Sequence, residues 1–138
     1  LPYDSNTFDI VTSFYALQAS QNIEKTLSEM IRVAKPNSPI LILTKHPIRN
    51  LLESCVNNRN PNYYNMGEVT SYIFNKSIKL SEPGHTMQEY FPESILKKAF
   101  LEKFEEHSDF PASERIIPCL NYPAYMILKY VKRGCKNE

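Results

Sequence analysis

The apolar positions in the first part of the chain follow two periods, one typical of strands and one typical of a helix. Residues 8–15 form a run of β-branched and aromatic side chains, which predicts a buried strand. From residue 23 to about residue 34 the apolar side chains recur on one face of a helix, and Asn22 before them is a good N-cap. Residues 39–44 are again almost continuously apolar, as in a strand that is covered on both faces. Strand, helix and strand in this order predict a parallel βαβ unit.

The end of the chain has a second set of periodic segments. Residues 92–100 have helical spacing, with Pro92 in the first turn. Residues 101–110 have the pattern of a weak strand and are too charged for the centre of a sheet. Residues 124–131 are apolar over the length of a strand. We therefore expect an α/β fold that closes with a helix and two strands.

Residues 46–91, between these two parts, are rich in Asn, Tyr and Pro. Residues 48–56 are compatible with a short helix, and residues 70–80 with a strand or an irregular segment. So long a segment between core elements more often carries function than serves as a plain connection. The expected organisation is one partial domain with a core strand-helix-strand at 1–45, an acceptor-side insert at 46–91, a closing helix and antiparallel strands at 92–132, and a tail at 133–138.

Composition narrows the classes of function. The 138 residues suffice for one domain, and 42% hydrophobic and 22% charged residues are ordinary for a soluble globular protein. The net charge of +1 lacks the basic excess of a nucleic-acid binder. No apolar run reaches the length of a membrane span, and the start does not resemble a signal peptide, so we expect a cytoplasmic protein with no nucleic-acid or membrane partner. The 3 cysteines lack metal-ligand spacing, which predicts reduced thiols and no metal site.

The glycines are few and far apart. The chain holds only 3, namely Gly67, Gly84 and Gly134. Such a chain cannot build the glycine-rich loop that usually holds a phosphate or a nucleotide. The sequence therefore disfavours an unrelated dinucleotide-binding α/β domain.

Three short motifs occur together at the start of the chain. Residues 1–11, LPYDSNTFDIV, resemble the LPF-x-D-x-S-FD-x-V segment of class I S-adenosylmethionine-dependent methyltransferases of the type 11-like group. Ala16 and Leu17 match the AL that follows this segment, and residues 29–36, EMIRVAKP, match E-x-x-RVLKP. Each motif alone is weak, but their order and spacing over about a third of the chain are fairly specific.

The resemblance implies a fold and a missing half. The chain is similar to the C-terminal half of a Rossmann-like methyltransferase sheet, with parallel strands, one antiparallel strand in the edge region and flanking helices. In this family a glycine-rich turn and a later acidic residue hold S-adenosylmethionine, and both precede the LPF segment. We therefore expect roughly the first 100 residues of a typical domain to lie before Leu1, and this fragment alone to be inactive.

The resemblance also implies cofactor contacts. The family positions that line S-adenosylmethionine or lie near its adenine correspond here to Leu1, Pro2, Ser13, Phe14 and Ala16. Family members often carry two histidines after the AL motif, and this chain has Gln18 and Ala19 there. That departure removes candidate acid–base groups. It does not exclude methyl transfer, because positioning supplies much of the acceleration when the electrophile is already strong.

Ligands in open α/β sheets sit beyond the carboxyl ends of the strands, which directs attention to His46. A histidine side chain ordinarily titrates near neutral pH, so His46 is the candidate for substrate contact and proton removal. The alternative, that His46 caps the turn before Pro47, is nearly as well supported by the sequence. The other positions expected to contact a small-molecule acceptor are Tyr15, Gln18, Tyr63, His85, Gln88 and Tyr90. A core position for Tyr15 and a surface loop for His85 are the structural alternatives.

Two functions follow from these patterns. The first is methyl transfer from S-adenosylmethionine to a small-molecule acceptor by the full-length protein. The alternative is a non-catalytic interaction protein on a degenerate methyltransferase fold. A G-x-G turn in the upstream coding sequence, with an acidic residue about 20 positions later, would favour the enzyme.

Overall fold

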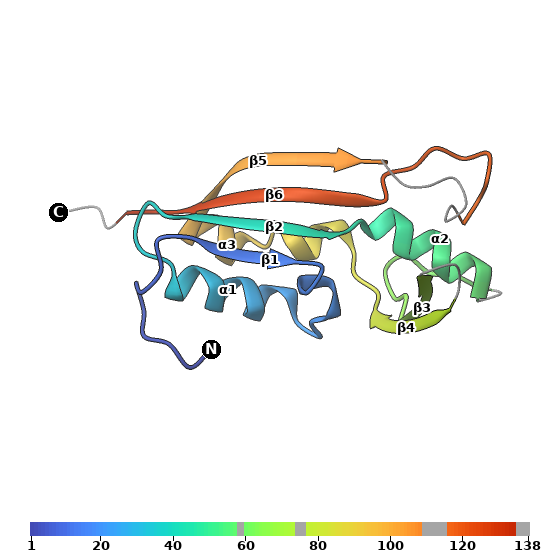
Figure 1. Ribbon diagram of the computed structural model, residues 1–138, viewed down its shortest axis with the longest axis horizontal. Helices are drawn as coiled ribbons and strands as arrows, with labels where there is room; N and C mark the ends of the chain where they lie inside the picture. Colours follow the sequence, from blue (N-terminus) through green and yellow to red (C-terminus); the bar gives the residue numbers. More distant parts are fainter. Residues whose placement is uncertain (58–59, 74–76, 109–115, 135–138) are drawn as a thin grey trace.

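A computed structural model describes residues 1–57, 60–73, 77–108 and 116–134 of the chain (Figure 1). Its elements, in chain order, are β1 Val11–Phe14, η1 Leu17–Ala19, α1 Ile23–Val33, β2 Pro39–Lys45, α2 Pro47–Asn57, β3 Glu68–Ile73, β4 Ile78–Pro83, η2 Met87–Tyr90, α3 Glu93–Lys98, β5 Ala99–His107 and β6 Tyr125–Lys132. The parts of the expected segment at 70–80, strand at 101–110 and tail at 133–138 that fall on residues 74–76, 109–115 and 135–138 lie outside the described residues.

Four strands form one mixed sheet in the order β1-β2-β6-β5. β1 and β2 are parallel, as the βαβ pattern predicts, and β6 is antiparallel to both β2 and β5. The α/β class and the single antiparallel strand near the edge are thus confirmed. The antiparallel strand lies second from the edge, however, and β5 runs in the direction of β1 and β2. The apolar β6 takes the inner place because charged β5 tolerates an edge better.

The first helix forms as its sequence predicts. α1 begins after Asn22, whose side chain accepts a hydrogen bond from the Lys25 amide at 2.8 Å. Its apolar stripe is buried.

The first strand is shorter than predicted. β1 starts only at Val11, and Phe8 forms an isolated parallel bridge to Ala34 instead. The segment before β1 therefore lies beside the end of α1 and does not extend the sheet.

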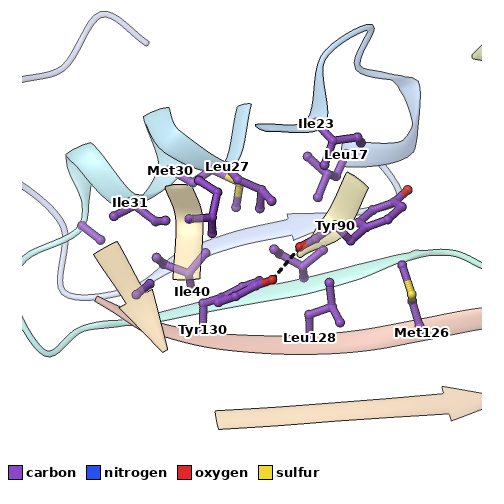
Figure 2. Packing of buried hydrophobic residues seen from close by; sticks show 14 residues of the cluster. Leu17, Ile23, Leu27, Met30, Ile31, Ile40, Tyr90, Met126, Leu128 and Tyr130 are labelled. Atoms are coloured by element: carbon purple, nitrogen blue, oxygen red, sulfur yellow. Dashed lines mark hydrogen bonds between the residues drawn. The ribbon is translucent and has the colours of Figure 1, made fainter. Parts of the chain in front are cut away.

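The core lies between the sheet and the helices on one of its faces. α1, α3 and η2 cover this face, and the alternate residues of β2 and β6 that point to it are almost fully buried (Figures 1 and 2). Tyr130 on β6 donates a hydrogen bond from its hydroxyl to the carbonyl oxygen of Tyr90 on η2 at 2.5 Å. The opposite face carries Leu41 and Leu43, which are only half-buried within the described part of the chain. One face of the sheet is thus packed and the other is left open.

Two side chains bind the start of the chain to this core. Arg32 forms a bidentate contact with Glu29, at 2.7 and 2.9 Å, and donates to the carbonyl oxygens of Tyr3 and Leu1. Lys132 of β6 donates to the carbonyl oxygen of Ala34 at 2.7 Å, at the C-terminal end of α1. A cation is favourable there because the last carbonyls of a helix lack partners. Arg32 thus gives the E-x-x-R motif a structural role.

The middle of the chain forms a small lobe at the carboxyl ends of β1 and β2. It comprises α2 and an antiparallel hairpin of β3 and β4 (Figure 1). Two paired strands, over 68–73 and 78–83, thus take the place of the single strand or irregular segment expected at residues 70–80. Gly84 follows β4, and a β-carbon there would lie 2.4 Å from that of Met66. The two chain segments can approach this closely only with glycine at that position.

Two further properties bear on the expectations from composition. No helix in the described ranges is long and apolar enough to cross a membrane. Cys55 and Cys119 are free and exposed, and Cys135 lies outside the described residues. In the described part of the chain, no group of three or more potential ligands could hold a metal ion.

Candidate functional site

Gln18 lies where the two parallel strands end. It follows β1 in the short helix η1 and is buried. Its side-chain oxygen accepts a hydrogen bond from the Thr44 hydroxyl of β2 at 2.9 Å, and its side-chain nitrogen donates to the carbonyl oxygen of Tyr15 at 2.9 Å. The same nitrogen lies 3.4 Å from a carboxylate oxygen of Glu82 on β4. One side chain therefore joins both strand ends to the hairpin.

Tyr15 occupies an unusual backbone conformation at the end of β1. Its φ angle is 50°, in the left-handed region that aromatic residues rarely adopt. Two hydrogen bonds hold it there, one from its amide to the Leu43 carbonyl at 2.8 Å and one from Gln18 to its own carbonyl. Its side chain is half-exposed. Strained residues of this kind concentrate at ligand sites, where the surrounding structure determines them.

A buried ion-pair network fixes the hairpin on the sheet. Lys45, at the end of β2, lies 3.0 Å from Glu53 of α2 and 2.8 Å from Glu82 of β4. Arg49 lies one helical turn before Glu53 and 3.0 Å from it. The network brings two cations and two carboxylates together, so its charges balance. Buried charges are tolerated only when they are paired in this way.

His46 is inaccessible, with only 1% of its surface exposed. Its Nδ1 accepts a hydrogen bond from the Ile48 amide at 3.0 Å, so the proton of the neutral ring sits on Nε2, which lies 2.7 Å from Glu106. Burial lowers the pKa of His46, and the Glu106 carboxylate opposes that shift. Both ring nitrogens are engaged, and the side chain caps the start of α2. This geometry favours the capping reading, and the catalytic role of His46 stays a prediction.

His85 and Glu89 form a close pair beside Gln18. The Nε2 of His85 lies 3.1 Å from the carbonyl oxygen of Gln18, which can only accept, so Nε2 carries a proton. Nδ1 lies 2.5 Å from a carboxylate oxygen of Glu89, one helical turn along the chain. His85 is buried, and Glu89 is partly exposed to solvent.

Two cavities meet at this pair. The first has a volume of about 620 Å³ and lies between the start of α1 and η2, lined by Gln21, Asn22, Ile23, Glu24, Gln88, Glu89, Phe91 and Pro92. The second has a volume of about 460 Å³ and lies beside the hairpin, lined by Gln21, Tyr63, Tyr64, Asn65, Met66, Gly67, Glu68, Pro83, Gly84, His85, Thr86 and Glu89. Gln21 and Glu89 line both cavities, so the two adjoin there, and we refer to them together as the groove.

The predicted acceptor residues fall on different parts of this region. Tyr63, His85 and Gln88 line the groove, and the Tyr63 hydroxyl accepts a hydrogen bond from the Met87 amide at 2.7 Å. Gln18 lies behind His85, whereas Tyr90 is fully buried in the core (Figure 2). A core position explains Tyr90 without a ligand. The structure thus brings three of the predicted residues to one groove and places Tyr90 and His46 away from its surface.

The predicted cofactor residues lie in two places, with Ser13, Phe14 and Ala16 at the end of β1 and Leu1 and Pro2 beside α1, where Leu1 contacts Glu29 and Arg32. Leu1 and Phe14 are 60% and 64% exposed, and Pro2 and Ala16 are also exposed. Among the described strands β1 pairs only with β2, so its other edge is open. Phe14 and Ala16 form an exposed wall at the carboxyl end of β1.

Comparisons with known proteins agree with this arrangement. Residues 1–42 match the family described as methyltransferase domain. The sequence similarity to this family thus covers the first third of the chain. The norajmaline N-methyltransferase of Rauvolfia serpentina is 46% identical over 54 residues, which are 39% of this chain and 18% of that protein. The ubiquinone/menaquinone biosynthesis C-methyltransferase UbiE of Idiomarina loihiensis is 44% identical over 43 residues, which are 31% of this chain and 17% of that protein.

Solved structures extend the similarity of fold to the rest of the chain. A Listeria monocytogenes protein assigned as an S-adenosylmethionine-dependent methyltransferase superposes with a TM-score of 0.70 at 14% identity, over 97% of this chain and 65% of that one. An S-adenosylmethionine-dependent methyltransferase of Mesorhizobium loti gives 0.63 at 12% identity, over 96% and 65%. The chain thus spans about two-thirds of the length of these structures. Its architecture is that of a methyltransferase sheet.

The exposed wall fits part of an S-adenosylmethionine site. Phe14 offers exposed apolar surface that suits an adenine ring, and the strained Tyr15 marks the strand end where ligands of such sheets bind. The wall is open along the free edge of β1, so the described residues surround a cofactor on one side only. The residues of this wall are compatible with the cofactor, but they do not enclose it.

Sequence reasoning missed the charged members of the site. Lys45, Glu53 and Glu82 come from three elements far apart in the chain, and Glu89 passes as a surface residue. Two signals pointed to them. Lys45 ends an otherwise apolar strand, and His85 and Glu89 have the i,i+4 spacing of paired side chains on a helical turn.

Proposed function

We propose that the full-length protein transfers a methyl group from S-adenosylmethionine to a small-molecule acceptor. The observation that carries this proposal is the position of the groove. It is lined by His85, which contacts the Gln18 carbonyl shortly after β1, and the exposed wall of Phe14 and Ala16 lies at the same end of β1. A cofactor against that wall and an acceptor in the groove would therefore lie next to each other.

The open surfaces of the sheet support a larger parent domain. Among the described strands the outer edge of β1 has no partner, and proteins usually cover such edges. The half-buried Leu41 and Leu43 lie on the face that the described helices leave open. Further strands beside β1 and helices over this face would complete both surfaces. The activity, acceptor and cofactor affinity of the whole protein are part of this proposal.

S-adenosylmethionine, when bound, would supply an electrophilic methyl group on a sulfonium. Leu1, Pro2 and Phe14 would contact its adenosine part, and Ser13 and Ala16 would contact it at the end of β1. The residues of the groove then have a positioning task. Holding the acceptor atom in line with the methyl group can supply a large part of the rate enhancement. A general base is needed only for acceptors that lose a proton before or during attack.

A calorimetric titration with S-adenosylmethionine tests the proposal. The natural full-length protein should bind the cofactor, and the isolated 138-residue chain should show weak or no binding because it offers one wall only. Circular dichroism would establish that both proteins are folded. Tight binding by the 138-residue chain, or no binding by the full-length protein, would contradict the proposed division of the site. In the second case the non-catalytic interaction protein becomes the better reading.

His46 is the predicted acid–base residue, and a catalytic role can be distinguished experimentally from its role in capping α2. Replacing His46 by Asn keeps a side chain that caps helices but removes the titratable group. If His46 acts in catalysis, both His46→Ala and His46→Asn lower turnover more than cofactor affinity. If it acts only as a cap, His46→Asn retains turnover and His46→Ala loses stability. The second pattern would remove His46 from the catalytic assignment.

A similar fold does not guarantee methyl transfer. The structure of SpnF, described as a [4+2]-cyclase, superposes on this chain with a TM-score of 0.55 at 13% identity. Related sheets thus support different chemistry, and function lies in the site. Transfer of a labelled methyl group from S-adenosylmethionine to a small molecule must therefore be measured directly.

A further inference from the structure

The charged side chains that line the groove beside His85 are mostly carboxylates. Its two cavities are lined by three carboxylates, those of Glu24, Glu68 and Glu89. Among the described residues that line them, none is Lys or Arg. The imidazole of His85, which contacts Glu89, can compensate at most one of the three negative charges. A negative charge on a ligand would therefore be repelled in this groove, and a positive charge would be attracted.

The aromatic side chains of the groove provide a second feature that suits a cation. Tyr63 and Tyr64 pack edge to face, with ring centroids 5.4 Å apart. The bond from the Met87 amide fixes Tyr63, and Tyr64, which is 86% exposed, lines the same cavity as Glu68. An aromatic ring face attracts ammonium groups, and a neighbouring carboxylate adds to that attraction.

The carboxylate at the junction of the cavities is held in place by the core. Glu89 receives its bond from His85, which is buried and is itself fixed by the Gln18 carbonyl. Its second oxygen has only a long contact of 3.4 Å with the Thr86 hydroxyl, so it retains capacity to accept hydrogen bonds. A fixed carboxylate loses little entropy when a ligand binds, which favours specific recognition.

From these features we infer that the groove recognises the positively charged amine of an organic cation, with Glu68 and Glu89 as the charge partners and Tyr64 as the aromatic contact. The inference rests on the proposed function for its setting, because it names the class of acceptor that the site takes. It concerns recognition of the acceptor, and the positive group is the handle by which the acceptor is held. Phosphorylated and carboxylated acceptors are disfavoured by the same charges.

Three small probes of similar shape test this inference in the natural full-length protein. They are 2-phenylethylamine, 2-phenylethanol and 3-phenylpropionate, which are cationic, neutral and anionic at neutral pH. Affinities measured by calorimetry should rank the amine about tenfold above the alcohol, with the carboxylate weakest. Added salt should weaken only the amine. Equal affinities for all three, or a preference for the carboxylate, would overturn the inference.

Matched variants locate the effect. Glu68→Gln and Tyr64→Ala should each lower the affinity for the amine. Glu68→Gln should leave the affinity for the alcohol nearly unchanged. Both side chains are exposed, so the variants should fold. Glu102→Gln on β5 and Tyr72→Ala on β3 change the same residue types outside the groove and should have no effect. Loss of the preference in the controls but not in the groove variants would place the cation elsewhere and overturn the assignment.

These binding measurements need no cofactor, which separates the two proposals. If the amine preference and its variant pattern hold but the protein neither binds nor uses S-adenosylmethionine, only the proposed function fails. If methyl transfer occurs to neutral or anionic acceptors and the probes show no preference, only the inference about the cation fails.

Discussion

The Thr44 hydroxyl donates a hydrogen bond to the side-chain oxygen of Gln18 at 2.9 Å, and both groups are buried. This bond joins the ends of β1 and β2 behind the groove. Family members often have histidine at the position of Gln18, and a glutamine here can donate and accept at once. Its amide uses both capacities, towards Tyr15 and Thr44. The departure from the family pattern therefore has a structural consequence at the strand ends.

Gln18→Leu should destabilise the natural full-length protein by about 1–3 kcal/mol, because it leaves buried polar partners unsatisfied. The Thr44 hydroxyl would keep only a long contact of 3.4 Å with the Tyr90 hydroxyl. Urea unfolding measures the change. Gln88→Leu, at an exposed position, is the matched control and should stay within about 0.5 kcal/mol of the unchanged protein. Equal effects of both substitutions would show that the Gln18 bonds contribute nothing.

Much of the sheet could be predicted because its periodicity is local. The run at 39–44 and the face of the helix from residue 23 determine β2 and α1 within one or two residues. The start of β1 could not be predicted, because Phe8 has the residue type of a strand but pairs with Ala34 across the end of α1. That choice depends on Arg32 and Lys132, which hold the segment from other parts of the chain.

Lys132→Met should destabilise the protein by about 1–2 kcal/mol, because the helix end of α1 loses the cation that binds its last carbonyls. Lys129 is on the same strand and contacts Glu102 at the surface. Lys129→Met is therefore the control, with an expected cost below about 1 kcal/mol. Thermal and urea unfolding of both variants give the comparison. A larger loss for Lys129→Met would contradict a capping role for Lys132.

Lys45→Met should be severe, at about 3 kcal/mol or more, because two carboxylates would stay in a buried place without their shared cation. Adding Glu82→Gln should recover part of this loss, since Glu53 still has Arg49 as a partner. The stability of the double variant relative to Lys45→Met is measured by urea unfolding. If Glu82→Gln destabilises both backgrounds equally, the two charges are not coupled and the network has been misassigned.

Tyr90 and Tyr130 predict a loss of stability in alkali. Burial raises the pKa of both hydroxyls well above the ordinary value of 10.0. The unfolded chain ionises its tyrosines from about pH 10, whereas the folded protein keeps these two protonated, so stability is complete below that pH and falls above it. Tyrosinate absorbance, followed together with circular dichroism, should show these two ionising only with unfolding. Ionisation of all 9 tyrosines in the folded protein would contradict the prediction.

The candidate site was harder to predict than the sheet, for a physical reason. A site residue is defined by neighbours from distant segments, as His85 is by Gln18 and Glu89. The sequence identified the histidines by residue type alone. It could not distinguish His46, whose nitrogens are both used inside the fold, from His85, which lies beside a cavity. It also proposed Tyr90 for the groove, although an aromatic residue at that spacing equally suits a core.

Tyr15→Gly separates strain from function at the end of β1. Glycine adopts a φ of 50° without the penalty that an aromatic residue bears, and the half-exposed ring loses little burial. The variant should therefore be as stable as the natural protein or more stable by up to about 1 kcal/mol, whereas methyl transfer should fall if the ring contacts cofactor or acceptor. Asn37 has a φ of 64° in an exposed turn far along the chain, and asparagine tolerates this region. Asn37→Gly is thus the control and should change neither stability nor turnover. If Tyr15→Gly unfolds the protein, or if it keeps full turnover, the strained conformation has no role in positioning a ligand.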